Sequence, residues 1–167
     1  PATTAVYTLS LHDALPICRG NQATARTRGK TSMSAEKKTC CGPLLVKLVY
    51  ACSGASDVGG ITDLAARRIG RSKVAYMSCA VGIGARIPEL LEPAQSAVGI
   101  LVLDGCERDC VRLCLEQSGI HRFEHLQLKR DFGWEKGKTP PDDDKIARVV
   151  ERGIQRLISL PIEEPTL

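Results

Sequence analysis

Residues 98–106 read VGILVLDGC, an apolar run that ends in a turn-forming Asp-Gly pair and a cysteine. A run of aliphatic and β-branched residues of this length is typical of a strand buried on both faces of a parallel sheet. Two earlier runs have the same design, since LLVKLVYAC (44–52) and KVAYMSC (73–79) also end in cysteine. A fourth strand is expected within HRFEHLQLKR (121–130).

Helical patterns separate these strands. Helices are predicted over 61–70, 89–97, 107–119 and 142–158, and Pro93 should break or kink the second of them. Gly119 is expected to stop the third helix, and 131–141 is expected to be a linker. Strands that alternate with helices predict an α/β fold. We expect a single-domain three-layer sandwich, Rossmann-like, with a mostly parallel sheet of about four strands.

The first 40 residues have no period that matches the rest of the chain. Residues 1–32 resemble the translation of sequencing-adapter DNA or of upstream sequence, and Met33 looks like the natural start. We therefore expect a non-native or disordered segment over 1–40, a globular domain over 41–160 and a tail over 161–167.

Charge and composition argue against two classes of partner. Residues 41–167 contain 17 Lys and Arg and 17 Asp and Glu, so this part carries no basic excess for nucleic acid. Few aromatic residues are available for base stacking, and no apolar run approaches the ~20 residues that cross a bilayer. The sequence thus predicts neither a nucleic-acid nor a membrane partner, and protein partners stay open.

The cysteines are regularly placed. Cys52, Cys79 and Cys106 each end a predicted strand, at equal intervals of 27 residues. Parallel strands end at one edge of a sheet and lie ~4.8 Å apart, so these thiols can converge. Cys110 adds a fourth thiol from the following helix. Four thiols suit a tetrahedral zinc site, with Zn–S distances near ~2.3 Å.

Cys114 falls outside this set. Cys106, Cys110 and Cys114 are spaced to share a helix face, but eight residues at ~1.5 Å each separate the outer two by ~12 Å. Two sulfurs on one zinc lie no more than ~4.6 Å apart. Cys114 is therefore expected to be a packing residue or an extra thiol. Cys40 and Cys41 are expected to be a flexible terminal pair.

Residues around the cysteines are expected to support them. Ser53 and Gly54 follow Cys52, while Asp104 and Gly105 precede Cys106. The glycines of SGASDVGG and VGIGARIP complete neither a P-loop nor a dinucleotide fingerprint. They are therefore expected to let the backbone approach the thiols closely. Asp104 is expected to accept a turn N–H or to tune the thiols. His121 and His125 are interpreted as ordinary polar residues of a strand.

Several of these stretches occur together in a known family. ACSGASDVGGITDLAARR, the MSC of 77–79, VGIGARIP, LDGCERDCVRLCLEQSGI and GWEKGKTP resemble the DGC-domain proteins, which are regarded as zinc-binding. The resemblance covers residues 44–150 and includes the Asp-Gly-Cys motif at 104–106. It implies a DGC-type domain within 41–160 and a metal site at Cys52, Cys79, Cys106 and Cys110, but no established reaction. Some similar sequences read CSGCS, whereas this chain has Ala55 at the second cysteine.

The sequence therefore predicts a metal-binding protein, with zinc as the metal and a structural or metal-handling role. A closed four-cysteine site leaves no position for water or substrate, which argues against a hydrolase. Two alternatives use the same cysteines: a thiol–disulfide oxidoreductase cycling Cys106 and Cys110, and an iron–sulfur protein. Whether the protein is an enzyme stays open. The cysteine content is below that of a disulfide scaffold, and residues 1–32 contain no apolar signal-peptide run, so a reducing compartment, the cytoplasm, is expected.

Overall fold

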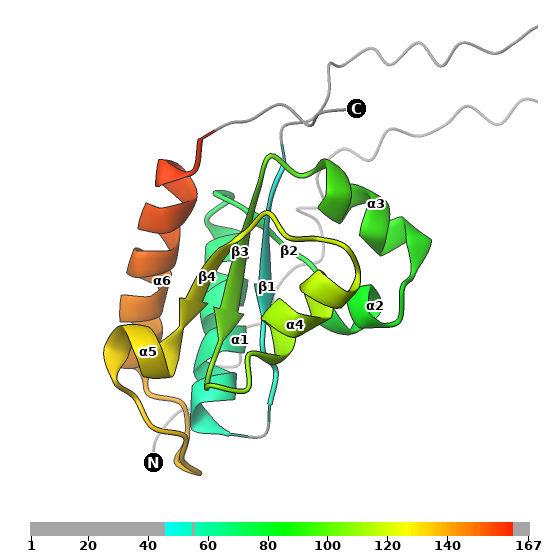
Figure 1. Ribbon diagram of the computed structural model, residues 1–167. Helices are drawn as coiled ribbons and strands as arrows, with labels where there is room; N and C mark the ends of the chain where they lie inside the picture. The colour runs from blue at the N-terminus through cyan, green and yellow to red at the C-terminus, as the bar shows by residue number, and fades with distance from the viewer. Residues whose placement is uncertain (1–45, 55, 162–167) are drawn as a thin grey trace, which may run out of the picture. The chain divides into compact units, whose positions relative to one another are not determined.

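The computed structural model describes residues 46–54 and 56–161, whose sheet has four parallel strands in the order β2-β1-β3-β4 (Figure 1). The strands are β1 (Lys47–Ala51), β2 (Tyr76–Met77), β3 (Gly99–Asp104) and β4 (Glu124–Gln127). β1 and β3 are central and pair over five residues, from Lys47 with Gly99 to Ala51 with Leu103. The predicted α/β fold with a parallel four-stranded sheet is confirmed.

Helices cover both faces of the sheet (Figure 1). They are α1 (Asp57–Arg71), α2 (Ala80–Gly84), α3 (Pro88–Ser96), α4 (Cys110–Gln117), α5 (Leu128–Phe132) and α6 (Asp143–Ser159). α1 and α6 pack on one face, whereas α2, α3 and α4 pack on the other.

Side chains alternate along the central strands, so each strand contributes residues to two separate cores on opposite faces of the sheet. On β1, Val49 faces α1 and α6, while Leu48 and Tyr50 face the opposite helices. β3 alternates likewise, with Leu101 on the first face and Val102 on the second. Because both faces are covered, both must be apolar, which explains the continuous apolar runs in the sequence.

Two helix boundaries differ from the prediction. α1 begins at Asp57 rather than at residue 61, because the Ser56 side chain caps it by accepting the Gly59 N–H at 3.3 Å. α3 contains Pro93 and continues to Ser96, so Pro93 does not break the helix. A proline in this short helix removes a single N–H donor, and Pro88 favours the helix start.

The structure also contains helices that were not expected. α2 and α5 each have five residues and occupy segments predicted as loop, strand or linker. α4 begins at Cys110, so residues 107–109 are not helical and Cys106 lies outside the helix. Gly119 has φ +80° directly after the Ser118 cap, as expected of a residue that stops a helix.

Some predictions fall on residues outside the described part of the chain. These include the N-terminal segment 1–40 with Cys18, Cys40 and Cys41, as well as Ala55 and most of the tail 161–167. Within the described residues, every helix is too short or too polar to cross a bilayer.

Candidate functional site

The four predicted metal-binding cysteines lie at the carboxyl edge of the sheet, where the strands end. Cys52 directly follows β1, Cys79 comes two residues after β2, and Cys106 comes two residues after β3. Cys110 is the first residue of α4. All four are free thiols. Cys79 and Cys110 are exposed, whereas Cys52 and Cys106 are partly buried.

The strand order creates a switch point at this edge, where the connections between strands change direction. The chain passes from β1 to β2 on one side, and from β3 to β4 on the other. In open parallel sheets such a switch between neighbouring strands opens a crevice at the carboxyl ends, where ligands bind. Here the switch point lies between β1 and β3. Cys52 flanks it on one side and Cys106 on the other, whereas Cys79 follows the edge strand.

The four sulfurs do not form the closed cluster that the spacing predicts. Within the described residues, one group of three His, Cys, Asp or Glu side chains has ligand atoms within 4.8 Å of one another, and it contains no cysteine. One reason is local. The Cys79 sulfur turns back on its own segment and accepts the Gly82 N–H at 3.4 Å.

Cys114, outside the predicted set, lies on the α2–α4 side of the sheet. It is partly buried against the α2–α3–α4 core, and its sulfur lies 3.2 Å from the Ala80 carbonyl oxygen. Burial raises the pKa of its thiol, and the charge of Cys79 adds to that rise.

Cys52 is held firmly by its neighbours. Its N–H donates to the Leu103 carbonyl at 2.8 Å, and its own carbonyl accepts the Thr62 hydroxyl at 2.5 Å. Burial raises the pKa of its thiol, the N–H groups of Gly54 and Gly105 oppose that rise, and the nearby charges of Asp104 and Cys110 add to it. The net pKa is above its ordinary value.

Close backbone contacts around Cys52 need glycine. A Cβ on Gly105 would lie 2.9 Å from the Val58 carbonyl carbon, and one on Gly59 would lie 2.9 Å from the Gly54 nitrogen. These glycines therefore let the ends of β1 and β3 meet the start of α1. The sequence interpretation of these glycines is consistent with this packing.

Asp104, the aspartate of the Asp-Gly-Cys motif, joins β3 to α4. Its carboxylate is buried, with 1% exposed, and accepts the N–H groups of Val111 at 3.0 Å and Arg112 at 3.1 Å. These are orphan donors at the start of α4. His125 Nε2 lies 3.1 Å from the same carboxylate. The donors belong to a helix, rather than to the turn that the sequence suggested.

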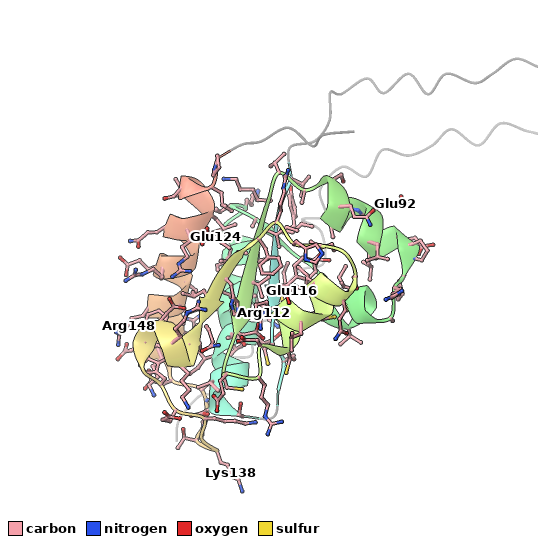
Figure 2. All side chains as sticks on the ribbon, viewed as in Figure 1. Glu92, Arg112, Glu116, Glu124, Lys138 and Arg148 are labelled. Carbon is pink, nitrogen blue, oxygen red and sulfur yellow. The ribbon has the colours of Figure 1, made fainter. Side chains whose placement is uncertain are left out.

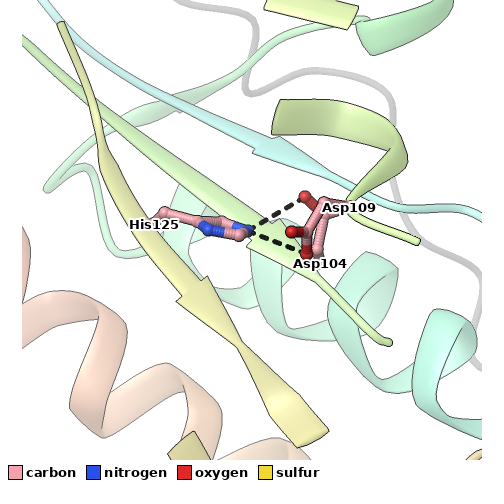
Figure 3. Close-up of side chains that lie close together, drawn as sticks. All are labelled: Asp104, Asp109 and His125. Carbon is pink, nitrogen blue, oxygen red and sulfur yellow. Dashed lines mark hydrogen bonds and ion pairs between the residues drawn. The ribbon is translucent and has the colours of Figure 1, made fainter. Parts of the chain in front are cut away.

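Asp109 and His125 extend this network (Figure 3). His125 Nε2 lies 3.7 Å from Asp109 Oδ1, which also accepts the Gln127 side-chain amide. Asp109 Oδ2 accepts Arg112 Nε at 3.2 Å, and Arg112 continues to Glu116 on the α4 surface (Figure 2). The network fixes the residue before Cys110, whose left-handed φ of +47° is unusual for a non-glycine residue.

These three side chains are also the one group in the described residues with ligand atoms close enough to hold a metal. The atoms nearest to one another are already hydrogen-bonded: Asp104 Oδ2 to the Arg112 N–H, and Asp109 Oδ1 to Gln127. The group is therefore satisfied by protein donors and acts as a positioning network for α4.

Sequence reasoning missed His125, Asp109 and Gln127. The available signal was alternation in β4, where apolar Leu126 separates His125 from Gln127. That alternation places both polar side chains on one face of the strand. The pairing of Gln127 with Asp104 then brings this face beside the Asp-Gly-Cys motif.

The expected linker 131–141 is anchored at the same edge of the sheet. The buried Asp57 carboxylate accepts the Gly137 N–H at 2.7 Å and the Thr139 hydroxyl at 3.3 Å. Although burial raises the pKa of Asp57, the Gly137, Val58 and Thr139 donors bring it below its ordinary value. Lys138, in the same segment, points away from the protein (Figure 2).

Three comparisons with known proteins complete the description. A family model described as "DGC domain" matches residues 48–152. The chain is also 43% identical over 81 residues to a Pseudomonas aeruginosa protein named "Anaerobic and virulence modulator AnvM". That match covers 48% of this chain and 62% of the relative. No solved structure matches the chain.

Proposed function

The chain belongs to the DGC-domain family, and we propose that it binds a metal ion, zinc, through cysteine thiolates at the carboxyl edge of its sheet. The observation that carries the proposal is the delivery of free thiols to this edge by three strand ends and the start of α4. The residues are Cys52, Cys79, Cys106 and Cys110.

The chemistry of this donor set fits zinc. Thiolates are preferred ligands of structural zinc sites, and four of them complete its tetrahedral shell. Cys52 and Cys106 follow the two strands at the switch point, β1 and β3, while Cys79 and Cys110 are exposed. Binding requires the sulfurs to draw closer than they are in this conformation, so we propose that the metal closes the edge loops.

A closed set of four thiolates determines what the metal can do. No coordination position is left for water or a substrate, so the ion is structural or is cargo handled by the protein. Such a site suits a regulatory rather than a hydrolytic role. A modulator is also what the name of the P. aeruginosa relative describes, although the chain spans 62% of that protein.

Elemental analysis of the full chain, purified without oxygen, tests the proposal together with a visible spectrum. We expect one colourless zinc per chain. Cys106→Ser should remove the stoichiometric metal, because it deletes a ligand at the switch point. Cys114→Ser is the matched control and should leave the metal in place, because Cys114 is not in the ligand set.

Other outcomes would contradict the assignment. Equal metal loss from both variants would reject the proposed ligand set. A brown, iron-containing protein would replace zinc with an iron–sulfur cluster. A metal-free protein with four reactive thiols would reject the metal site and favour a thiol–disulfide oxidoreductase that uses Cys106 and Cys110.

A further inference from the structure

Cys79 and Cys114 lie on neighbouring elements on the α2–α4 side of the sheet. α2 and α4 pack against each other, and Cys79 immediately precedes α2. The Cys114 sulfur lies 3.2 Å from the carbonyl oxygen of Ala80, the residue next to Cys79. Gly84 makes room for this sulfur, because a Cβ there would lie 2.9 Å from it.

A buried tyrosine lies beside Cys79. Tyr50 on β1 is completely buried, and Ser78 and Cys79 are its polar neighbours. Among the buried side-chain nitrogen and oxygen atoms of the described residues, its hydroxyl oxygen is the one without a hydrogen bond of normal geometry. A buried unsatisfied hydroxyl is costly. Ser78 and Cys79 are the side chains near enough to act on it.

A cleft of about 370 Å³ gives access to Cys79 from solvent. Besides Cys79, the lining includes Ser53, Asp63, Arg67, Met77, Ser78 and Val81. Cys79 is exposed, whereas Cys114 is partly buried. A small molecule in the cleft therefore meets Cys79, while the Cys114 sulfur on α4 lies against Ala80, another residue of the lining.

We propose that Cys79 and Cys114 are the reacting pair of a thiol–disulfide exchange site whose substrate is a small disulfide bound in this cleft. The Cys79 thiolate attacks one sulfur of the substrate, forming a mixed disulfide and releasing one thiolate, which takes a proton. Cys114 then loses its proton to solvent and attacks the Cys79 sulfur. The second substrate thiol leaves, and a Cys79–Cys114 disulfide remains. Two electrons pass from the protein to the small disulfide.

Two groups assist the first step. The Gly82 N–H already donates to the Cys79 sulfur at 3.4 Å and so orients it. In the proposal, the Tyr50 hydroxyl is a second donor to this sulfur during the reaction. Tyr50 is thus a positioning residue for Cys79. The proposal goes beyond metal binding, since Cys114 is not a metal ligand in the proposed site and the reaction needs no metal.

Peptide mapping of the full chain tests the pairing. The reduced protein, stripped of metal with a chelator, is exposed to oxidised glutathione, alkylated and digested with trypsin. Cleavage at Arg86, Arg108 and Arg112 separates Cys79, Cys106, Cys110 and Cys114 into different peptides. We expect the peptide of Cys79 joined to the peptide of Cys114, with loss of both thiols.

Variants separate the two steps. Cys114→Ser should stop at a glutathione adduct on Cys79. Gly84→Ala should leave the first step unchanged and slow the second, because its Cβ displaces the Cys114 sulfur. Tyr50→Phe should slow the adduct about fivefold, the equivalent of one lost hydrogen bond, without loss of stability.

Three results would overturn the proposal. A disulfide that joins Cys79 to Cys52, Cys106 or Cys110 would replace the pair with another. An unreactive Cys79 would remove the exchange site altogether. An unchanged adduct rate in Tyr50→Phe would reject the role given to Tyr50. Because metal content is measured separately and the mapping uses metal-free protein, failure of the zinc site would leave this test intact.

Discussion

At the scale of single residues, Asp104 carries the largest structural role in the candidate site. A buried carboxylate must be satisfied by donors, and Asp104 receives two backbone N–H groups and one imidazole. Both backbone donors belong to the first turn of α4, whose positive dipole end also favours the charge. The Asp-Gly-Cys motif therefore includes an aspartate that fixes the helix on which Cys110 and Cys114 lie.

Replacing Asp104 should destabilise the protein more than replacing an exposed aspartate. Asp104→Asn keeps the size of the side chain but turns one acceptor into a donor that faces N–H groups. We expect a loss of about 2–3 kcal/mol in the free energy of unfolding, measured by urea denaturation. Asp144→Asn, in the exposed first turn of α6, is the control and should stay within about 0.5 kcal/mol. Equal effects would show that the Asp104 network is not needed for stability.

Asp57 shows how one titrating residue links two distant segments. Its pKa is lowered in the fold, because the Gly137, Val58 and Thr139 donors outweigh the effect of burial. A lowered folded pKa gives stability that is complete above the unfolded value of about 3.9 and is lost as pH falls through the folded pKa. The contribution should therefore be full at neutral pH and absent in strong acid.

Denaturation as a function of pH checks this prediction. Asp57→Asn should be less stable than the parent at pH 7, and the difference should shrink below about pH 4 as the parent carboxylate takes up a proton. Asp144→Asn is again the control, since its side chain has no such anchoring role. A difference for Asp57→Asn that persists unchanged into strong acid would contradict the linkage.

At the scale of elements, the contact between β3 and α1 depends on a missing side chain. A Cβ on Gly105 would meet backbone atoms of Val58 and Gly59 at 2.9 and 3.0 Å. Backbone at the start of a helix cannot move aside as a flexible side chain can. The end of β3 can reach the loop of Cys52 only if this residue is glycine.

Gly105→Ala should therefore cost about 2–3 kcal/mol of stability through overpacking. Gly54→Ala is the matched control at the same edge of the sheet, because its Cβ would lie an ordinary 3.8 Å from the Cys52 sulfur. Thermal and urea unfolding of both variants measure the difference. If Gly54→Ala is as damaging as Gly105→Ala, the close contact between β3 and α1 is not the cause.

The elements also show which parts of the fold were predictable from sequence. The strands ending near Cys52, Cys79 and Cys106 could be located because strands buried on both faces are apolar throughout. α2 could not, because Gly82 and Gly84 are poor helix formers. These glycines instead leave room for side chains that are distant in sequence. A Cβ on Gly82 would meet Leu90, and one on Gly84 would meet Cys114.

For the candidate site, the sequence predicts which edge of the sheet carries the thiols but not how the side chains are arranged there. Equal cysteine spacing correctly located the thiols along one edge, since that depends on strand direction alone. Their distances from one another depend on side-chain orientation, as the turn of Cys79 toward Gly82 illustrates. The network of Asp104 and His125 depends on the register of β3 with β4, in which Asp104 pairs with Gln127. Local sequence patterns do not encode such long-range contacts.

At the scale of the whole molecule, the sheet divides the cysteines between two neighbourhoods. Cys52, Cys106 and Cys110 follow the strands at the switch point, β1 and β3, whereas Cys79 follows the edge strand β2, and the Cys114 sulfur contacts the carbonyl of the next residue, Ala80. Cys79 is the residue common to both proposals, as a zinc ligand and as the reactive thiol of the exchange site. One sulfur cannot serve both uses at once, so metal binding and disulfide formation should exclude each other.

This competition gives the last prediction. Zinc-loaded protein treated with oxidised glutathione should form the Cys79–Cys114 disulfide more slowly than metal-free protein, because a metal-bound thiolate is not free to attack. Completed oxidation should release zinc, which a chromogenic chelator detects. Cys114→Ser distinguishes zinc loss caused by the disulfide from zinc loss caused by the glutathione adduct. This variant cannot form the disulfide, so Cys79 should bind zinc again once the adduct is reduced. If zinc neither slows the disulfide nor leaves with it, Cys79 is not a ligand, and the metal site must consist of other residues.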